Sequence, residues 1–297
     1  MKRGHWQILL AAALFLLALG LTLYPVVSNW YIGRHQSRIQ TEYREVLEQT
    51  DSAEIESIRE SAVAYNKTIT PGAAEEAYSQ ASIRLAAEDY VNQLNVSGSG
   101  IMGYVEIPKI GVDLPIYHGT GADSLDRGTG HLLGSSLPVG GESTHTIITG
   151  HSGMASQKMF TDLEQLREGD IFYLHVLDET LTYEVREIHT VLPHDTTYLG
   201  IEPGEDLCTL VTCTPTGVNT HRLLVHGSRI PYVPTEETEA SAVPHEENTD
   251  SHWEKQYWFG VRLGLAAMAT VVLLLSVYLF FRKKKTVKKK GGRYVRK

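Results

Sequence analysis

Two long apolar runs, one near each end, are the feature that most constrains this 297-residue chain. Residues 8–27 form a run of 20 mostly apolar residues, and residues 257–281 form a second of 25 with Arg262 as its single charge. Each is long enough to cross the roughly 30 Å hydrocarbon core of a membrane as a helix. A cleaved signal peptide fits the first run less well, because its apolar core usually has about 7–15 residues and no small-x-small site follows here. We therefore expect two transmembrane helices.

The charges are divided unevenly between the ends and the middle of the chain. Residues 282–297 carry ten Lys and Arg, Lys2 and Arg3 precede the first apolar run, and neither end contains Asp or Glu. The positive-inside rule then places both termini in the cytoplasm. The segment between the runs keeps 14 Lys and Arg against all 35 Asp and Glu, a net charge of −21. Such a segment repels nucleic acid, whereas the basic tail suits anionic lipid heads.

The middle of the chain changes character near residue 100. Residues 34–95 are rich in Glu, Gln, Ala and Arg, which predicts helices over 35–62 and 73–93. From residue 101 to 232 short alternating runs are separated by Gly and Pro, and many short strands at this spacing predict a closed or nearly closed barrel. The expected strands are 101–107, 113–118, 145–150, 171–177, 181–192, 207–213 and 221–230, with a short helix over 159–168.

The two cysteines are unsuited to pair with each other. Cys208 and Cys213 lie five residues apart in the run DLCTLVTC, which as a strand separates them by about 16 Å and turns them to opposite faces. A disulfide needs Cα atoms within about 7 Å. We therefore expect at least one free thiol, with Cys208 serving as a small buried apolar residue.

Cys213 is expected to face an arginine. If 207–213 and 221–230 pair antiparallel across the loop TPTGVNT, the register that aligns Leu210 with Val225 sets Cys213 opposite Arg222. A guanidinium beside a thiol favours the reactive thiolate. The alternative is a cysteine that ends a buried strand and an arginine that caps loop carbonyls, and the hairpin alone leaves both interpretations open.

A nucleophilic cysteine needs an acid–base partner, and His151 is the candidate. It follows the alternating run HTIIT and lies between Gly150 and Gly153, where small residues let another segment approach closely. The competing use of these residues is a metal site. The sequence has no C-x-x-C or H-E-x-x-H spacing, and His221 and His226 point to opposite faces of a strand. We expect no metal and no cofactor.

Three motifs, in order, resemble the signature of the sortases, the membrane-anchored cysteine transpeptidases of Gram-positive surfaces. They are ITGHSG at 148–153, TLVTCTP at 209–215 and NTHRLLVHG at 219–227, and the resemblance extends over about 101–232. The chain is most similar to class C, the pilin-polymerising sortases, which also carry N-terminal helices and a second membrane helix. The resemblance implies a mainly β fold: an eight-stranded barrel with N-terminal helices, flanked by two transmembrane helices.

The resemblance also implies roles for three residues. Cys213 would be the nucleophile, His151 the general acid–base, and Arg222 the group that orients substrate and stabilises the oxyanion. The implied substrate is an LPxTG-like sorting signal, cleaved between Thr and Gly and transferred as a thioacyl group to a lysine amine of another pilin subunit. The alternatives are a sortase that anchors surface proteins to cell-wall peptide and a non-catalytic, membrane-tethered binding module.

One family feature is missing. Class C sortases commonly have an Asp-Pro-aromatic motif before the barrel, in a lid that covers the catalytic cysteine and arginine. Residues 60–100 contain no such triplet. We expect the lid to be absent or unanchored, and Cys213 to react quickly with thiol reagents. In the alternative interpretation, Glu75 or Glu76 together with Tyr78 replaces the motif.

These inferences combine into a two-pass membrane protein whose catalytic region is extracellular. The expected segments are a cytoplasmic N-terminus at 1–7, a transmembrane helix at 8–27, an extracellular helical region at 28–100, a catalytic barrel at 101–232, a flexible spacer at 233–256, a second transmembrane helix at 257–281 and a basic cytoplasmic tail at 282–297.

Overall fold

The structure is a computed structural model that describes residues 3–70, 72–79, 88–154, 157–232 and 252–291. The chain forms two compact units, one made of Met1–Trp30 with Glu254–Lys297 and the other of Tyr31–Trp253. Most of the spacer expected at 233–256, and the end of the basic tail, lie outside the described residues.

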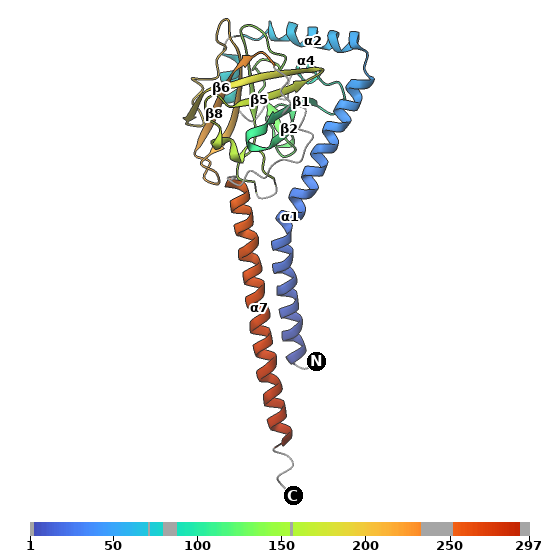
Figure 1. Cartoon of the computed structure of the whole chain (residues 1–297), viewed down its shortest axis with the longest axis vertical. Coiled ribbons are helices and arrows are strands. Elements are labelled where there is room, and N and C mark those ends of the chain that lie inside the picture. The colour runs from blue at the N-terminus through green and yellow to red at the C-terminus, as the bar shows by residue number, and fades with distance from the viewer. Residues whose placement is uncertain (1–2, 71, 80–87, 155–156, 233–251, 292–297) are drawn as a thin grey trace. The chain divides into compact units, whose positions relative to one another are not determined.

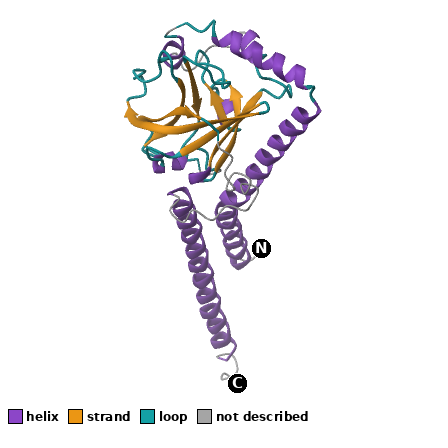
Figure 2. Cartoon of the chain, turned by 45° about the horizontal axis from the view of Figure 1, so that its top comes forward, coloured by secondary structure: helices purple, strands orange, loops and turns teal. Residues whose placement is uncertain are grey.

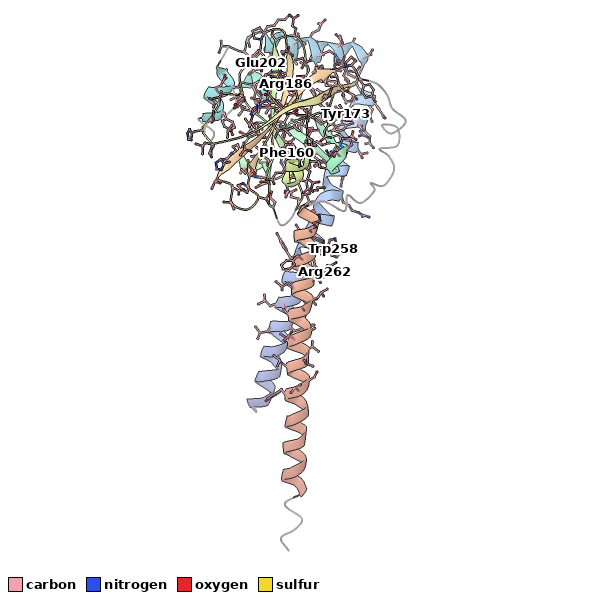
Figure 3. The ribbon with its side chains drawn as sticks, turned by 60° about the vertical axis from the view of Figure 1, so that its left-hand side comes forward. Phe160, Tyr173, Arg186, Glu202, Trp258 and Arg262 are labelled. Atoms are coloured by element: carbon pink, nitrogen blue, oxygen red, sulfur yellow. The ribbon has the colours of Figure 1, made fainter. Side chains whose placement is uncertain are left out.

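The smaller unit contains the two terminal helices, the first part of α1 (Arg3–Gln49) and α7 (His252–Gly291). Within the described residues, one helical stretch is long and apolar enough to cross a membrane, Tyr257–Tyr278, whereas Ala12–Tyr24 is a shorter apolar stretch. The second expected membrane helix is therefore not confirmed by this criterion. Trp258 and Arg262 lie near the start of α7 (Figure 3).

The helices before the barrel differ from the predicted ones. The expected helix at 35–62 is interrupted, because α1 ends at Gln49 and α2 (Ser52–Asn66) begins after Asp51, whose carboxylate accepts a hydrogen bond from the backbone N–H of Ala53 (2.8 Å). This is an ordinary N-cap. Two short helices, α3 (Ala73–Ser79) and α4 (Glu88–Val91), lie within the expected helix at 73–93, and residues 80–87 between them are outside the described residues.

A closed β-barrel forms the body of the larger unit (Figures 1 and 2). In the described part of the chain its order is β1-β2-β3-β4-β7-β8-β6-β5, with β5 returning to β1. The strands are β1 (Ile101–Ile107), β2 (Val112–His118), β3 (Thr129–His131), β4 (Thr144–Thr149), β5 (Ile171–Val176), β6 (Glu179–Val191), β7 (Asp206–Thr214) and β8 (His221–Ile230). The short elements between them are η1 (Pro108–Ile110), α5 (Ala122–Leu125) and η2 (Thr161–Gln165).

The seven expected strands are present with small shifts at their ends, and β3 was missed. Three residues with a central glycine give no alternating pattern that sequence inspection could detect. The expected helix at 159–168 is a 3₁₀ helix, η2, whose side chains at Thr161–Leu163 are buried. The barrel with N-terminal helices is as expected.

Apolar side chains pack against both faces of β7, because successive side chains of a strand point to opposite sides. Cys208 and Leu210 belong to the large internal core, together with residues of α2 and α4. Val211 belongs to a second, smaller apolar cluster, which lies on the outer face. The sequence predicted at least one free thiol, and both cysteines are free, with Cys208 fully buried and Cys213 partly exposed.

Gly103 provides a test of how tightly the barrel closes. A Cβ at this position would lie 2.3 Å from the carbonyl oxygen of His175 on β5, and the backbone there has little room to move. Gly103→Ala is therefore expected to lower the free energy of unfolding by about 1–3 kcal/mol. Urea denaturation followed by circular dichroism checks this. Gly121→Ala, where an added Cβ meets nothing within 4 Å, serves as the control, and equal losses in both variants would contradict the expectation.

Candidate active site

The β7–β8 hairpin brings Cys213 and Arg222 together. The strands pair antiparallel with Leu210 opposite Val225 and Cys213 opposite Arg222, so the predicted register is confirmed. Both residues lie next to the loop end of the hairpin, and both are partly exposed. A cross-strand pair of this kind has Cβ atoms about 5 Å apart, which places the guanidinium within reach of the thiol.

Arg222 also contacts the loop that follows β7. Its Nη1 donates to the carbonyl oxygens of His221 (3.0 Å) and Asn219 (3.4 Å). The interpretation of this arginine as a cap for loop carbonyls therefore describes one of its contacts. The two roles are compatible, because a guanidinium has five N–H donors and a fixed planar shape.

His151 lies next to Cys213 because β4 runs parallel to β7. The last sheet pair is Thr149 with Val211, and the backbone N–H of Gly150 donates to the carbonyl of Val211 (3.0 Å). Beyond that point side chains replace the ladder. The hydroxyl of Thr212 donates to the carbonyl of Gly150 (2.8 Å), and the hydroxyl of Ser152 donates to the carbonyl of Cys213 (2.5 Å).

The backbone around His151 is fixed from the other side by Phe160, which is labelled in Figure 3. The N–H of Phe160 donates to the carbonyl of His151 (2.9 Å), and its ring lies 2.6 Å from where a Cβ on Gly150 would be. Only glycine fits at that position. The glycine before His151 is therefore explained by close packing of this ring.

A carboxylate that sequence inspection missed lies near His151. The Nε2 of His151 is 3.8 Å from Oδ1 of Asp126, which follows the short helix α5. The Asp126 side chain is 65% exposed, so water screens this interaction and it contributes little to stability. No sequence signal connects the two residues, because only the fold brings them together.

The expectation that no anchored lid exists is wrong. Helix α3 packs on the outer face of the barrel, where Ala74 and Tyr78 join one buried cluster. The other members of this cluster are Leu132, Ile147, Val191, Leu199, Val211 and Leu224. Ala73 also packs closely, because its carbonyl lies 2.6 Å from where a Cβ on Gly134 would be. Apolar burial of Ala74 and Tyr78 holds this cover in place without an Asp-Pro-aromatic motif.

Tyr78 is the residue of α3 that lies beside the candidate site. Burial raises the pKa of its hydroxyl, the positive charge of Arg222 opposes that rise, and a charge on Cys213 adds to it. The guanidinium of Arg222 lies close to this hydroxyl, but no hydrogen bond of good geometry joins the two. The apolar ring therefore carries the contact. The alternative interpretation, in which Glu75 or Glu76 acts with Tyr78, is supported for Tyr78 only: Glu75 lies beside Gly200 of the β6–β7 loop, and the side chain of Glu76 is outside the described residues.

Among the residues that the structure describes, no group of three or more His, Cys, Asp or Glu side chains is arranged to hold a metal ion. On the neighbouring strands, His145, His189 and His226 are hydrogen-bonded to backbone carbonyls, hydroxyls or carboxylates instead. The chemistry of the described site is that of a thiol, an imidazole and a guanidinium.

Comparison with known proteins identifies the family. The sortase domain model matches residues 105–230. Sortase C of Streptococcus pneumoniae, whose structure was solved in a study of catalysis and pilin substrate specificity, is 44% identical and superimposes with a TM-score of 0.60, covering 67% of this chain and 100% of that one. The chain belongs to the sortase family. A pilus-related sortase C of Group B Streptococcus is 41% identical with a TM-score of 0.60, over 65% of this chain and 97% of that one.

A curated relative extends the match beyond the barrel. Sortase A of Streptococcus agalactiae is 26% identical over 221 residues, which is 73% of this chain and 82% of that protein. Sortases are cysteine transpeptidases of Gram-positive bacteria that are associated with the membrane and act on surface or pilin proteins carrying sorting signals. This sortase is therefore a cysteine transpeptidase, and class C sortases are among its strong structural matches.

The position of Tyr78 predicts slow modification of Cys213 by small thiol reagents. Tyr78→Ala is expected to raise the labelling rate constant by at least about tenfold, because truncating a buried aromatic side chain costs the closed form well over about 1.4 kcal/mol. Tyr78→Phe keeps the ring and should label like the wild type. Stopped-flow measurement with a methanethiosulfonate reagent on the full-length chain in detergent checks both. Equal rates in all three proteins would show that α3 does not restrict access.

Proposed function

We propose that this sortase polymerises pilins: it cleaves an LPxTG-like sorting signal between Thr and Gly, holds the acyl group on Cys213, and transfers it to a lysine amine of another pilin subunit. The observation that supports this most is the joint placement of Cys213, Arg222 and His151 around the end of β7. Two of the solved structures that this chain resembles are a sortase C studied for its pilin substrate specificity and a pilus-related sortase C.

In the first half of the proposed reaction, the Cys213 thiolate attacks the carbonyl carbon of the substrate threonine. A C–S bond forms, and negative charge moves to the carbonyl oxygen, where Arg222 donates a hydrogen bond. The C–N bond to glycine then breaks as His151, in its protonated form, gives its proton to the departing amine. The products of this half are a thioester on Cys213 and a free N-terminal glycine.

In the second half, a lysine amine of the next subunit attacks the thioester carbonyl. His151, now neutral, accepts the proton that this amine loses, and the C–S bond breaks to regenerate the thiolate. An isopeptide bond links the two subunits. No metal, cofactor or external oxidant enters either half, and the same three residues carry both.

The outer apolar cluster under α3 suits an extended sorting peptide. Ile147, Val211 and Leu224 lie on neighbouring strands of the same face as Cys213, and Tyr78 and Ala74 cover them. The apolar leucine and proline of a sorting signal would replace the apolar contacts of α3. In this proposal the closed form is a resting state, and α3 moves before substrate binds.

We further propose that the enzyme crosses the membrane twice, with the barrel outside and both termini in the cytoplasm. Support comes from the apolar span at Tyr257–Tyr278, the shorter apolar stretch at Ala12–Tyr24, and the basic residues that flank both ends of the chain. The acidic region between the helices, with its net charge of −21, would then face the cell wall.

The central test of this proposal uses an LPxTG-type peptide and the full-length chain in detergent. Cys213→Ala is expected to abolish cleavage, because no other described group can form the thioester, while leaving the circular dichroism spectrum unchanged. Cys208→Ala, which alters the buried thiol, is expected to remain active and controls for the loss of a cysteine as such. Undiminished cleavage by Cys213→Ala would contradict the proposed role.

The acceptor distinguishes polymerisation from anchoring. Incubation with a pilin carrying a sorting signal is expected to give a Thr–Lys isopeptide between subunits, detectable by mass spectrometry of the digested product. Transfer to peptidoglycan-type amines alone would instead support the alternative in which the enzyme attaches surface proteins to cell-wall peptide. An absence of any turnover, with the fold intact, would support a binding module.

Ser152 is expected to act as a positioning residue. Ser152→Ala removes the hydrogen bond to the Cys213 carbonyl, and one such bond contributes about 0.5–1.5 kcal/mol, so kcat should fall roughly 2- to 10-fold with KM little changed. Ser152→Thr keeps the hydroxyl and should restore most of the rate. Ser99→Ala, on an exposed loop, is the control. A change in KM alone would show that Ser152 acts on substrate binding instead.

A further inference from the structure

Two buried histidines and a threonine form a hydrogen-bonded chain on the same outer face as Cys213. His145 comes from β4, Thr209 from β7 and His226 from β8, and their side chains are buried. Thr209 lies two residues before Val211 and four before Cys213, so all three share one face of β7. The proposed reaction uses none of these three groups.

Hydrogen bonding fixes the direction of this chain. The carbonyl of Gly200 can only accept, so Nδ1 of His145 donates to it (2.7 Å) and Nε2 of His145 is left as an acceptor. The hydroxyl of Thr209 donates to that Nε2 (2.6 Å) and accepts from Nδ1 of His226 (2.7 Å). The chain ends at Nε2 of His226, which is buried and has no hydrogen-bond partner among the described residues.

The groups around His226 offer no good hydrogen-bond acceptor for a second proton on its ring. His189 packs against it edge to face, with ring centres 5.5 Å apart, and Tyr198 stacks on His189 at 3.8 Å. The carboxylate of Glu187, opposite His226 on β6, is shared between His189 (2.9 Å) and Arg186 (3.1 Å). The charged groups that face the pair are Arg186, Glu187 and His189 from β6, Glu202 from the β6–β7 loop, and Glu75 from α3.

The hydrogen-bonded chain of His145, Thr209 and His226 is shielded from solvent by the same segments that cover Cys213. Gly200, its terminal acceptor, lies in the β6–β7 loop, and the neighbouring Leu199 packs in the cluster with Ala74 and Tyr78 of α3. Oε1 of Glu75 lies 3.1 Å from where a Cβ on Gly200 would be. In Figure 3 Arg186 and Glu202 lie side by side, and their ion pair ties the loop to β6. Water reaches the imidazoles only if this cover moves.

We propose that the His145–Thr209–His226 chain is an acid-sensitive latch, in which protonation of either imidazole opens the cover formed by α3 and the β6–β7 loop over Cys213. In the neutral chain each donor has one acceptor. A proton added at His226 lacks an acceptor in the closed form, and a proton added at His145 breaks the bond from Thr209, because Nε2 then carries a hydrogen. Opening lets water solvate the charge.

The sign of the effect follows from the burial of both groups. Burial, and then the neighbouring His145, lower the pKa of His226 from 6.5 to about 3 in the closed form, and burial lowers the pKa of His145. The closed cover is therefore fully stable above pH about 6.5, and its stability falls as the pH drops from there toward about 3. Protonation of His226 alone is expected to make the equilibrium constant for opening about tenfold larger at pH about 5.5 than at neutral pH.

Hydrogen exchange measured by mass spectrometry tests the latch. The full-length chain in detergent is compared at pH about 7.5 and about 5.5, with rates corrected for the intrinsic pH dependence of exchange. Residues 73–79 and 195–203 are expected to lose protection at least about tenfold on acidification. His226→Phe removes the unpartnered nitrogen and should reduce that loss by the roughly tenfold share of His226, leaving only the share of His145. His194→Gln, an exposed histidine of the same loop, should retain the whole loss.

Two results would overturn the latch: protection of these segments that does not change with pH in the wild type, or an equal change in His226→Phe and His194→Gln. If His226→Phe fails to fold, carbon-13 NMR of labelled histidines in the wild type decides. An imidazole of the pair that titrates near its ordinary value while residues 73–79 stay protected would reject the proposal.

The latch builds on the proposed active site, but its test measures movement of the cover and needs no turnover. A chain that cleaves no sorting peptide yet opens in acid would keep the latch and reject the proposed reaction. A chain that cleaves the peptide with a cover insensitive to pH would do the opposite.

Discussion

The pairing of β7 with a parallel neighbour on one side and an antiparallel neighbour on the other is the constraint on which the site depends. Antiparallel β8 returns through a short loop and places Arg222 opposite Cys213. Parallel β4 ends at the same edge of the sheet and delivers His151 there. The strand pairing therefore brings His151 to a Cys213–Arg222 pair that lies more than sixty residues later in the sequence.

The hairpin was predictable because its alternation is strict. A one-residue slip would turn every side chain of β7 to the wrong face, so the hydrophobic pattern fixes the register of Cys213 and Arg222. The same geometry predicted that the two cysteines do not pair with each other, which the structure confirms. His151 became a candidate from its position after an alternating run and between glycines, and its role stays a prediction; the ring of Phe160 that explains Gly150 could not be inferred.

Other features of the site could not be predicted, because they depend on contacts between residues that are distant in sequence. Helix α3 has modest apolar content, and only the outer cluster with Val211 and Leu224 shows why Ala74 and Tyr78 pack there. The missing motif gave the wrong expectation about the cover, because apolar burial of Ala74 and Tyr78 is enough to hold α3 on the barrel. Asp126 gave no signal at all, and the break before Asp51 was overlooked because helix-forming residues continue on both sides.

The outer face of β7 also has a consequence for how such an enzyme can change. The strand is anchored by its inward residues Cys208 and Leu210, and its pairing with β8 is complete by the time the loop begins. The residues between Thr214 and His221 contribute nothing to that core. A change of sequence in this loop therefore leaves Cys213 opposite Arg222 and alters only the loop's own contacts, such as the one from Arg222 to the Asn219 carbonyl, whereas a single insertion or deletion inside β7 would turn the thiol to the other face of the strand.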